Sequence, residues 1–525
     1  MSVGLPPHLA ALATARAYPH PVDSVEVIET HISWVLLAGE FAYKIKRPVC
    51  YAFIDLREPA HRKHLCEEEV RLNRRFAPEL YVDVCEVVSV GGQARIGGHG
   101  MVLEHAVRMR RFGRDEELDR LLDSRRVAPS ELEAFGRELA LIHAHLPAAT
   151  RAARWGQPVE IQSLIIRNLI ECAQAARVFG TEAEVRALQA PLESRLPPVA
   201  AWMAARRASG RIRECHGDLH SRNVVRLGGR LVAFDCIEFE PAFRWIDVAE
   251  EVAVLSSDLA ARDRPLHAHA FRGGYLAQSG DYNLCRLLRL YEAHRALVRA
   301  KVAALSAADV SSALEREPLL QEHLRLLAHA SAAVRSWGAK PPLILMSGLS
   351  GSGKTWLARP LAERLGAIHL RSDVERKRAA GLGERSQSHS ALGDGLYARA
   401  ASEAVYEHLA RGAEDVIVGG YGAIVDAAFL QRAQRAPFLA LARRLNVKLW
   451  LVSCDAPVGV LRARIAQRGH SGRDASEADQ AVLEWQMAHR EPVQPQEGID
   501  AIEVSTAEPQ ALDQVLGAIR GSARA

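Results

Sequence analysis

The sequence predicts a two-domain protein whose C-terminal domain is a doubly wound α/β fold. The chain has 525 residues, which is more than one hydrophobic core usually serves, and 48% hydrophobic with 25% charged residues is an ordinary globular composition. In the last third, short apolar runs alternate with helical stretches after a glycine-rich loop, which is typical of a parallel sheet. We therefore expect domains at residues 1–335 and 340–525.

The boundary between the two domains is expected near residues 331–342. Residues 287–330 carry a long, arginine-rich helical pattern. The run Trp337–Pro342 then interrupts that pattern with a glycine and two prolines. The apolar run at residues 343–346 follows directly and is the first expected strand of the C-terminal domain.

Residues 348–355 read GLSGSGKT and fit the phosphate-binding pattern G-x-x-x-x-G-K-[ST]. Glycines let consecutive backbone N–H groups turn towards a phosphate, the lysine reaches the β- and γ-oxygens, and the threonine hydroxyl ligates Mg²⁺. A glycine-serine turn without a ligand is the alternative, and the strand-to-helix context speaks against it. The residues expected to contact nucleotide are Gly348, Ser350, Gly351, Ser352, Gly353, Lys354 and Thr355.

A second pattern lies at residues 216–223, which read HGDLHSRN. Asp218 and Asn223 have the spacing of a kinase catalytic loop, in which the aspartate accepts the proton of the substrate hydroxyl and the asparagine holds Mg²⁺. Two strand-like runs around Gly228-Gly229 predict a tight hairpin. Because a hairpin returns the chain to its start, Asp235 is expected beside Asn223 as a second Mg²⁺ ligand.

These residues resemble the aminoglycoside phosphotransferase branch of the protein-kinase-like fold, in which H-G-D-x-x-x-x-N replaces H-R-D-x-x-x-x-N. The resemblance spans about residues 25–330 and implies an α+β domain that binds ATP. It implies a phosphate-pairing lysine on the hairpin formed by residues 34–37 and 41–46. Lys44 is the expected residue, and Lys46 on the same strand face is the alternative.

The resemblance also implies residues that bind ATP or support its binding in the part of the chain between that hairpin and residues 216–223. The helix near residues 66–75 contains three consecutive glutamates, Glu67, Glu68 and Glu69. Glu68 is the leading candidate to pair with the lysine, and its two neighbours are the alternatives. A solvated acidic turn is the alternative. Residues 101–106, including Glu104 and Ala106, are expected to form the linker that hydrogen-bonds adenine.

Two features of protein kinases are missing from the sequence. No G-x-G-x-x-G precedes Lys44, where only Gly39 occurs, and no A-P-E follows Asp235. Aminoglycoside-phosphotransferase-like enzymes commonly lack the glycine flap. The absence of A-P-E argues against a peptide docked on an activation segment, so a small hydroxylated molecule is the expected substrate.

In the C-terminal domain, the run at residues 367–370 is followed by Asp373 and Arg376. This D-x-x-R resembles that of polynucleotide-kinase-like and gluconate-kinase-like P-loop kinases, and it implies a carboxylate that activates the acceptor hydroxyl and an arginine that steadies the phosphate. Ligands bind at the carboxyl ends of parallel strands, so the location agrees with that role. An ordinary helix N-cap is the alternative for Asp373.

The remaining C-terminal features are three further strands and a basic helix. We expect the third strand at residues 416–418 or 424–426, and Asp426 is the candidate acid that orients Mg²⁺. Later strands are expected at residues 447–452 and 501–504. Arg464 and Arg468 share a helix face and resemble the lid of small kinases, for which a solvated basic face is the alternative.

The net charge and the cysteine content of the chain limit the kinds of partner and the cellular location that the sequence favours. The net charge of +4 is spread through the chain, so nucleic acid is not expected as an obligate partner. The eight cysteines form no C-x-x-C, which favours reduced thiols in the cytoplasm. No run of about 18 apolar residues occurs, so no membrane span is expected. The sequence indicates no oligomeric state.

Taken over nearly its whole length, the chain resembles bacterial two-domain proteins described as bifunctional aminoglycoside phosphotransferase/ATP-binding proteins. This resemblance implies an ATP- and Mg²⁺-dependent phosphotransferase with two nucleotide sites that act on small hydroxylated acceptors. In one alternative, only one domain catalyses and the other is a nucleotide-binding regulatory module. In another, the protein is an ATPase switch.

Overall fold

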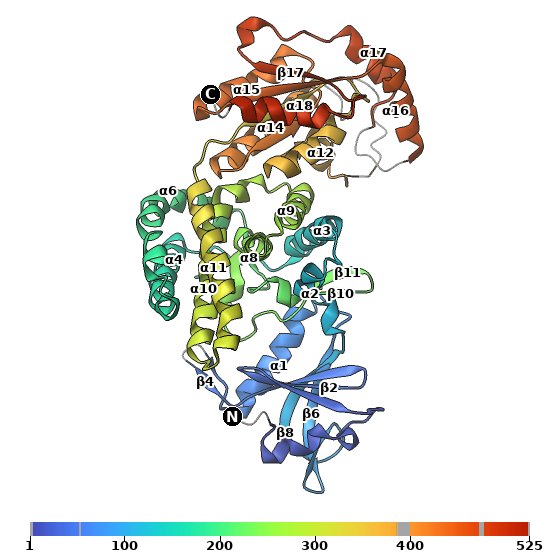
Figure 1. Cartoon of the computed structure of the whole chain (residues 1–525). Coiled ribbons are helices and arrows are strands. Elements are labelled where there is room, and N and C mark those ends of the chain that lie inside the picture. The colour runs from blue at the N-terminus through green and yellow to red at the C-terminus, as the bar shows by residue number, and fades with distance from the viewer. Residues whose placement is uncertain (1–3, 52–53, 385, 387–398, 472–476, 523–525) are drawn as a thin grey trace. The chain divides into compact units, whose positions relative to one another are not determined.

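The computed structural model describes residues 4–51, 54–384, 386, 399–471 and 477–522. The chain forms two compact units (Figure 1). The first unit contains residues 1–162 and 203–258, and the second contains residues 163–202 and 259–525. The predicted boundary between residues 335 and 340 lies inside the second unit, directly after a helix that ends at Ser336, and it stays a prediction.

The first unit is built on a six-stranded antiparallel sheet in the order β1-β2-β3-β8-β6-β7. Its strands are β1 (Val25–Glu29), β2 (Ser33–Ala38), β3 (Phe41–Lys46), β6 (Tyr81–Val90), β7 (Gln93–Ile96) and β8 (Met101–Arg110). β2 and β3 form the predicted hairpin, in which Ala38 pairs with Phe41. This hairpin places the side chains of Lys44 and Lys46 on one face of β3.

Both faces of this sheet are covered by apolar side chains, as the alternation along its strands requires. On one face, Leu9 and Leu12 of the 3₁₀ helix η1 (Pro7–Ala13) pack with Leu36. On the other face, Val70 of helix α1 (Pro59–Asn73) packs with Val107. Helix α1 is thereby fixed against the face of β3 that carries Ala42 and the two lysines.

The rest of the first unit contains short strand pairs and helices around the catalytic loop. β10 (Val224–Leu227) and β11 (Arg230–Ala233) form the predicted hairpin, and Gly228 and Gly229 both have positive φ angles, as its tight turn requires. The other elements are η2 (Ala15–Ala17), β4 (Cys50–Tyr51), β5 (Ile54–Asp55), η3 (Arg114–Glu116), α2 (Leu118–Asp123), α3 (Pro129–His145), β9 (Ile212–Glu214), η5 (Ser221–Asn223), α7 (Pro241–Arg244) and β12 (Trp245–Asp247).

The second unit contains a five-stranded parallel sheet in the order β14-β15-β13-β16-β17. The strands are β13 (Leu343–Ser347), β14 (Ile368–Arg371), β15 (Ala423–Asp426), β16 (Leu449–Asp455) and β17 (Asp500–Ser505). The parallel sheet confirms the predicted α/β fold. Of the two positions proposed for the third strand, residues 424–426 are correct and residues 416–418 are wrong, because the latter end helix α14 (Arg399–Val418).

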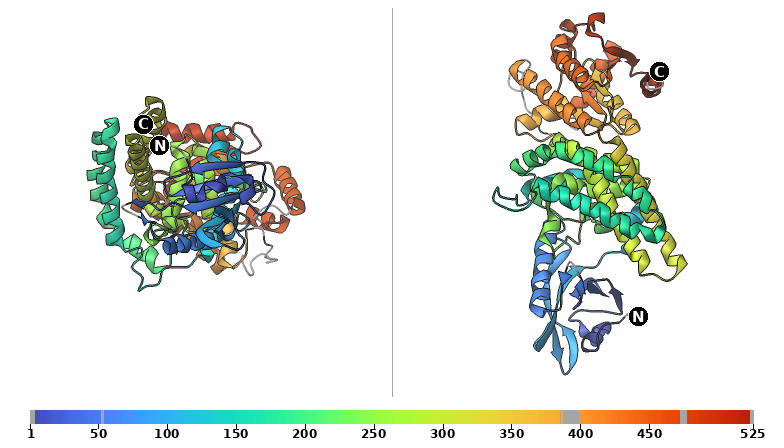
Figure 2. Two further views of the ribbon diagram at one scale, coloured as in Figure 1. Left: turned by 90° about the horizontal axis from the view of Figure 1, so that it is seen from below. Right: turned by 90° about the vertical axis from the view of Figure 1, so that its left-hand side faces the viewer.

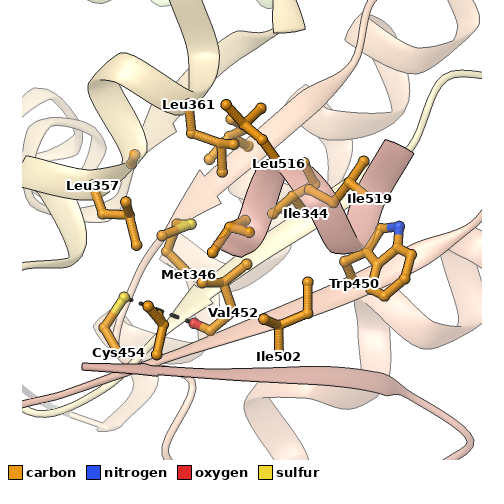
Figure 3. Packing of buried hydrophobic residues seen from close by; sticks show 14 of the residues in the cluster. Ile344, Met346, Leu357, Leu361, Trp450, Val452, Cys454, Ile502, Leu516 and Ile519 are labelled. Atoms are coloured by element: carbon orange, nitrogen blue, oxygen red, sulfur yellow. Dashed lines mark hydrogen bonds between the residues drawn. The ribbon is translucent and has the colours of Figure 1, made fainter. Parts of the chain in front are cut away.

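Both faces of the parallel sheet are buried, which is why its strands are apolar without alternation. Ile344, Met346 and Val452 pack with Leu357 and Leu361 of helix α12 (Lys354–Leu365) on one face (Figure 3). The alternate residues along the same strands, Leu343, Leu345, Val425 and Leu451, are also buried. The sheet therefore lies between two helical layers. The glycine loop follows the carboxyl end of its strand β13.

The helices around the parallel sheet begin with α12 (Lys354–Leu365), directly after the glycine loop. The others are α13 (Ser372–Ala379), α15 (Arg432–Leu445), α16 (Val458–Ser471), α17 (Gln480–Ala488), η8 (Pro495–Glu497) and α18 (Ala511–Ser522). The second unit also contains a helical segment, in which α10 (Cys285–Ala308) and α11 (Ala313–Ser336) run side by side (Figures 1 and 2).

The remaining helices of the second unit are α9 (Pro265–Ser279), η4 (Ala176–Phe179), α5 (Glu182–Arg186) and η6 (Tyr282–Leu284). Three helices run across the division between the units, α4 (Pro158–Ala175), α6 (Gln189–Ala208) and α8 (Val248–Ala261). Among the residues that the structure describes, no helix has both the length and the apolar character that a membrane span requires.

Candidate active sites

The glycine loop connects β13 to α12 at the carboxyl end of the parallel sheet. Gly348, Gly351 and Gly353 have φ angles of 145°, 81° and 83°, a region that other residues rarely adopt. A Cβ atom on Gly348 would lie 2.3 Å from the carbonyl oxygen of Cys454 at the end of β16. Glycine is therefore required here both by the backbone conformation and by the close approach of the neighbouring strand.

Two side chains of the first turn of α12 contact the glycine loop and the end of β15. Lys354 Nζ donates hydrogen bonds to the carbonyl oxygens of Gly348 and Leu349, at 2.9 Å each, and lies across the loop. Thr355 Oγ1 donates to Asp426 Oδ2 at 2.6 Å. The structure thus brings together the threonine and the acid that the sequence suggested for Mg²⁺.

Asp426 is buried at the end of β15, and its charge is stabilised there. Burial raises the pKa of the Asp426 carboxyl, but His369 and Lys354 outweigh burial and lower the pKa to about 2. His369 Nε2 lies 3.2 Å from Asp426 Oδ2. Sequence reasoning missed His369, which lies within β14 and contacts Asp426 of the neighbouring strand β15.

The loop is also held by residues that the sequence gave no reason to select. The Ser350 N–H donates to Gln486 Oε1 of α17 at 2.7 Å, and Thr506 Oγ1 donates to the carbonyl oxygen of Ser352 at 2.7 Å. Arg464 donates to Thr506 Oγ1 at 2.9 Å and to the Gly351 carbonyl at 3.2 Å. Arg464 therefore contacts the loop backbone, whereas the side chain of Arg468 lies outside the described residues.

Asp373 and Arg376 lie on α13, which follows β14 directly. The N-cap of α13 is Arg371, so the alternative interpretation of Asp373 as an ordinary N-cap is wrong. Arg376 donates to Ser402 Oγ at 3.1 Å. Both side chains are partly exposed, and β14 ends opposite Asp426, since Arg371 pairs with Asp426 across the sheet.

The first unit holds a separate set of charged groups around β3. Lys44 Nζ donates to Glu69 Oε1 at 2.8 Å, and Lys46 contacts the other oxygen of Glu69 and also Glu238. Burial lowers the pKa of Lys44, but Asp235 and Glu69 outweigh it and hold the pKa above its usual range. One fully buried carboxylate therefore pairs with both candidate lysines.

The expected pairing of Glu68 with Lys44 is wrong, because Glu69 makes that contact. Helix α1 packs through Leu65, Cys66 and Val70 and thereby turns Glu69 towards β3, since successive helix residues are rotated by about 100°. Glu68 points away and pairs with Arg71 at 2.7 Å. Among the described residues, the side-chain bonds of Lys44 and Lys46 go to Glu69, Asp235 and Glu238 rather than to Glu67.

Asp235 is held next to Lys44 by an uncommon backbone conformation. Its φ angle is 65°, its N–H donates to Tyr81 Oη at 3.0 Å, and its carboxylate forms an ion pair with Lys44. Partial withdrawal from solvent raises the pKa of Asp235, but Lys44 outweighs that effect and lowers it. The carboxylate is thus charged and available to a cation.

Two buried acids of α8 accept hydrogen bonds from the backbone of the candidate catalytic loop at residues 216–223. Glu251 accepts hydrogen bonds from the N–H groups of His216 and Gly217, at 2.8 and 3.1 Å, and Asp258 accepts from the N–H of Ser221 at 2.9 Å. Sequence reasoning missed both acids, because nothing in the local pattern of α8 separates them from surface residues.

Within the loop, Asn223 Nδ2 donates to the backbone carbonyl of Asp218 at 3.0 Å, which leaves the amide oxygen of Asn223 as the free end for a cation. The N–H of Phe234 donates to the Asn223 carbonyl at 3.0 Å, so Asp235 follows directly beside Asn223, as the hairpin predicted. His220 Nε2 lies 3.3 Å from Asp218 Oδ2.

Residues 101–106 are not a linker, which corrects the expectation for Glu104 and Ala106. They lie in β8, where Ala106 pairs with Ile45 of β3 and with Cys85 of β6, so their backbone groups belong to the sheet. The buried Glu104 carboxylate pairs with Arg62. A ten-residue strand and a linker give the same apolar run in a sequence, and only the sheet partners distinguish them.

The chain leaves the sheet after Arg110, and this later segment borders a cavity of about 410 Å³. Leu37, Gly39 and Glu40 line the cavity from the β2–β3 hairpin, and residues 110–114 line it from the other side. The N–H of Arg111 donates to the Glu40 carbonyl at 2.8 Å and fixes the two sides together. A volume of this size suits a small organic ligand.

Both sets of residues fit ATP with Mg²⁺. Mg²⁺ is held in proteins by one or two carboxylate or neutral oxygens together with phosphate oxygens. Thr355 and Asp426 supply such oxygens behind the glycine loop, and Asn223 and Asp235 supply them beside Lys44. In the described part of the chain, no group of three or more His, Cys, Asp or Glu side chains is arranged to hold a metal without added ligands.

Two family models match separate segments of the chain. Residues 51–297 match the phosphotransferase enzyme family, and residues 343–493 match an AAA domain. Among curated proteins, the chain is 28% identical over 484 residues to an uncharacterized protein of Mycobacterium tuberculosis and to one of Mycobacterium bovis, covering 90% of this chain and 93% of each relative. The family matches confirm the resemblance drawn from the two motifs.

Solved structures of small-molecule kinases also align with about a third of the chain. A sugar kinase from Janibacter sp. HTCC2649 aligns with a TM-score of 0.26 and 19% identity, covering 34% of this chain and 93% of its own. A gluconokinase from Sinorhizobium meliloti 1021 aligns with a TM-score of 0.24 and 18% identity, covering 35% and 94%. A shikimate kinase from Acinetobacter baumannii aligns with a TM-score of 0.26 and 17% identity, covering 36% and 97%.

Proposed function

We propose, for a chain that combines a phosphotransferase-family segment with an AAA-domain segment, an ATP- and Mg²⁺-dependent phosphotransferase with two nucleotide sites. Each site transfers the γ-phosphoryl group to a hydroxyl of a small acceptor. The observation that carries the proposal is that each unit places a lysine near two oxygen-bearing side chains, Lys354 with Thr355 and Asp426 in one unit and Lys44 with Asn223 and Asp235 in the other. The eight cysteines are all free thiols, which supports a cytoplasmic location.

At the C-terminal site, the glycine loop binds the phosphates through its N–H groups and the N-terminus of α12. Lys354 would pair with the β- and γ-phosphates in place of the loop carbonyls, and Thr355 and Asp426 would hold Mg²⁺, which would offset the charge of the phosphate oxygens. Asp373 accepts the proton of the acceptor hydroxyl as its oxygen attacks the γ-phosphorus, and the bond from that phosphorus to the β,γ-bridging oxygen breaks, so that ADP leaves. Arg376 and Arg464 stabilise the charge of the transferring group.

At the N-terminal site, Asp218 accepts the proton of the acceptor hydroxyl. Asn223 and Asp235 hold Mg²⁺, and Lys44 pairs with the phosphates while Glu69 keeps its Nζ in place. Adenine occupies the cavity between the β2–β3 hairpin and residues 110–114. No activation segment is required for this step, so the acceptor is a small hydroxylated molecule rather than a peptide.

A second candidate function is that the first unit binds nucleotide only to regulate the second. The specific observation in its favour is the missing glycine flap, since only Gly39 precedes Lys44 on the β2–β3 hairpin. Asp218, Asn223 and Asp235, assembled on one hairpin and loop, favour catalysis in the first unit instead.

Lys354→Ala tests the C-terminal site in the full chain with Asp218→Ala as the background. The loss of a cation that a neutral side chain cannot replace should abolish the remaining ATP turnover, measured as phosphate release. Lys340→Ala, at an exposed position before β13, is the matched control and should leave the turnover unchanged. Equal turnover in the Lys354→Ala and Lys340→Ala chains would show that the glycine loop is not catalytic.

A further inference from the structure

Helix α13 is anchored on the side opposite its proposed active-site residues. Asp373 and Arg376 are three residues apart and share one helix face, whereas Glu375 lies on another face and is only 2% exposed. Tyr282 Oη donates to Glu375 Oε1 at 2.8 Å, and His408 Nε2 lies 3.1 Å from Glu375 Oε2. Glu375 is the residue of α13 with the most polar partners on its buried side.

The main partner comes from the other family segment. Tyr282 belongs to η6, between α9 and α10, and lies within the residues that match the phosphotransferase family, whereas Glu375 lies within the AAA match. Arg378 of α13 forms an ion pair with Glu375 and donates to the carbonyl oxygen of Ala277 in α9. A Cβ atom on Gly280 would lie 2.6 Å from the Arg378 guanidinium. Helix α13 is therefore packed closely against the α9–η6 turn.

A second bond of the same kind joins the two segments elsewhere in this unit. Tyr421 Oη, in the turn before β15, donates to the fully buried Glu292 of α10 at 3.0 Å. Glu292 also pairs with Arg289 at 3.1 Å. Each segment thus supplies one tyrosine and one glutamate, but only the Tyr282–Glu375 bond reaches α13.

The Glu375 carboxylate is charged, so its hydrogen bonds are strong ones. Burial raises the pKa of Glu375, but His408 and Arg378 outweigh it and lower the pKa. A hydrogen bond to an ionised group contributes about twice as much as one between neutral groups. Removal of the tyrosine hydroxyl leaves a buried carboxylate with one donor fewer, which costs more than the bond itself contributed.

We infer that Glu375 is a positioning residue, through which Tyr282 of the phosphotransferase-family segment fixes α13 and therefore Asp373 and Arg376 at the C-terminal site. The inference rests on the proposed function, which assigns Asp373 and Arg376 to the acceptor. The acceptor side of that site is accordingly completed by residues that precede the AAA segment. Separation of the chain at residues 335–340 would remove this support.

Hydrogen exchange of the full chain tests the anchoring without an acceptor. Tyr282→Phe should accelerate exchange of the α13 amides by about tenfold or more, the effect expected from the loss of one charge-assisted bond. Tyr421→Phe removes the other tyrosine–glutamate bond between the same segments and serves as the control, with α13 exchange unchanged. If Tyr282→Phe leaves α13 exchange at the wild-type rate, or if both variants accelerate it equally, the inference is wrong.

A double-mutant cycle tests the effect on the reaction. ATP turnover with water as the acceptor is measured in the Asp218→Ala chain for Tyr282→Phe, Glu375→Gln and both together. If Tyr282 acts through Glu375, each change lowers kcat about tenfold with KM for ATP unchanged, and the double variant is no slower than the slower single variant. Additive losses, or a loss confined to KM, would overturn the inference.

The two arms separate this inference from the proposed function. If Lys354→Ala removes no ATP turnover from the Asp218→Ala chain, the proposed C-terminal activity is refuted. The exchange rates of α13 would still decide whether Tyr282 anchors that helix. Faster exchange of α13 together with unchanged kcat would contradict the positioning role.

Discussion

At the scale of single residues, Glu69 is the most constrained group of the N-terminal site. It is completely buried and accepts from Lys44 and Lys46 with its two oxygens, while Lys46 also contacts Glu238. Asp235 also pairs with Lys44, so the cluster holds two lysines and three carboxylates. Loss of the Glu69 carboxylate removes an ion-pair partner from both lysines at once, which is strongly destabilising.

Glu69→Gln should therefore lower the free energy of unfolding by about 3 kcal/mol and reduce ATP turnover of the first site about tenfold or more. Turnover is measured in the Lys354→Ala chain, and stability is measured by denaturant unfolding. Glu68→Gln is the matched control, since Glu68 is partly exposed, its nearest partner is the half-exposed Arg71, and its contact with the buried Arg244 is longer, at 3.5 Å. It should change stability by less than about 1 kcal/mol. Equal effects of the two variants would contradict the assignment of Glu69.

Asp373→Asn tests the acceptor side of the C-terminal site. It should lower phosphoryl transfer about 10²-fold and leave ATP affinity unchanged, because the general base touches the acceptor and not the nucleotide. Asp513→Asn, on the exposed side of α18, is the control. If ATP affinity collapses while transfer per bound ATP is kept, Asp373 is a metal-binding or structural residue.

The limits of sequence reasoning at this scale have a geometric cause. Lys44 was predicted from the family resemblance, and Lys46 was its alternative because the strand period places both side chains on one face. The glutamate was misassigned by one position, because rotation of α1 about its axis depends on how Cys66 and Val70 pack on the sheet. His369, Gln486 and Glu251 were missed since each contributes only through contacts with residues far away in the sequence.

At the scale of elements, the sequence predicts a linker at residues 101–106, but these residues lie in strand β8. The chain leaves the sheet only after Arg110, and residues 110–114 border the cavity. Hairpins, the glycine loop and the order of helices and strands were predicted, since turn glycines and apolar runs are local signals. Besides the linker at residues 101–106, which lie in strand β8, the sequence offers residues 416–418 as one of two positions for a strand, and these residues end helix α14. In both places a short apolar run is ambiguous until its partners are known.

Leu37→Trp should fill part of this cavity and weaken ATP binding to the first unit about tenfold or more, because a bulky ring takes the space that adenine needs. Val102→Trp, at a position of β8 that is 43% exposed and outside the cavity, is the matched control. Binding is measured by titration of the Lys354→Ala chain with ATP and Mg²⁺. If the Leu37→Trp and Val102→Trp chains bind ATP equally well, adenine lies elsewhere.

At the scale of the whole molecule, the compact units and the family segments do not divide the chain at the same place. The match to the phosphotransferase family runs to residue 297, but residues from 259 onwards group with the parallel sheet. Contacts such as Tyr282–Glu375 explain the grouping, and no local pattern reveals them. The sequence predicts one candidate set of catalytic and metal-binding residues for each domain, and the described residues of each set lie together within one compact unit.

The central claim is that both sites transfer phosphate. The most direct test measures the transfer of a labelled γ-phosphate from ATP to an acceptor. The Lys354→Ala chain and the Lys354→Ala, Asp218→Ala chain are incubated with Mg²⁺, ATP labelled in the γ-phosphate and a pool of hydroxylated metabolites. We predict that the first chain labels an acceptor and that the second does not. If the Lys354→Ala chain transfers no label to any acceptor that the wild-type chain labels, while its first unit still binds ATP, the N-terminal site is regulatory and the claim of two catalytic sites is wrong.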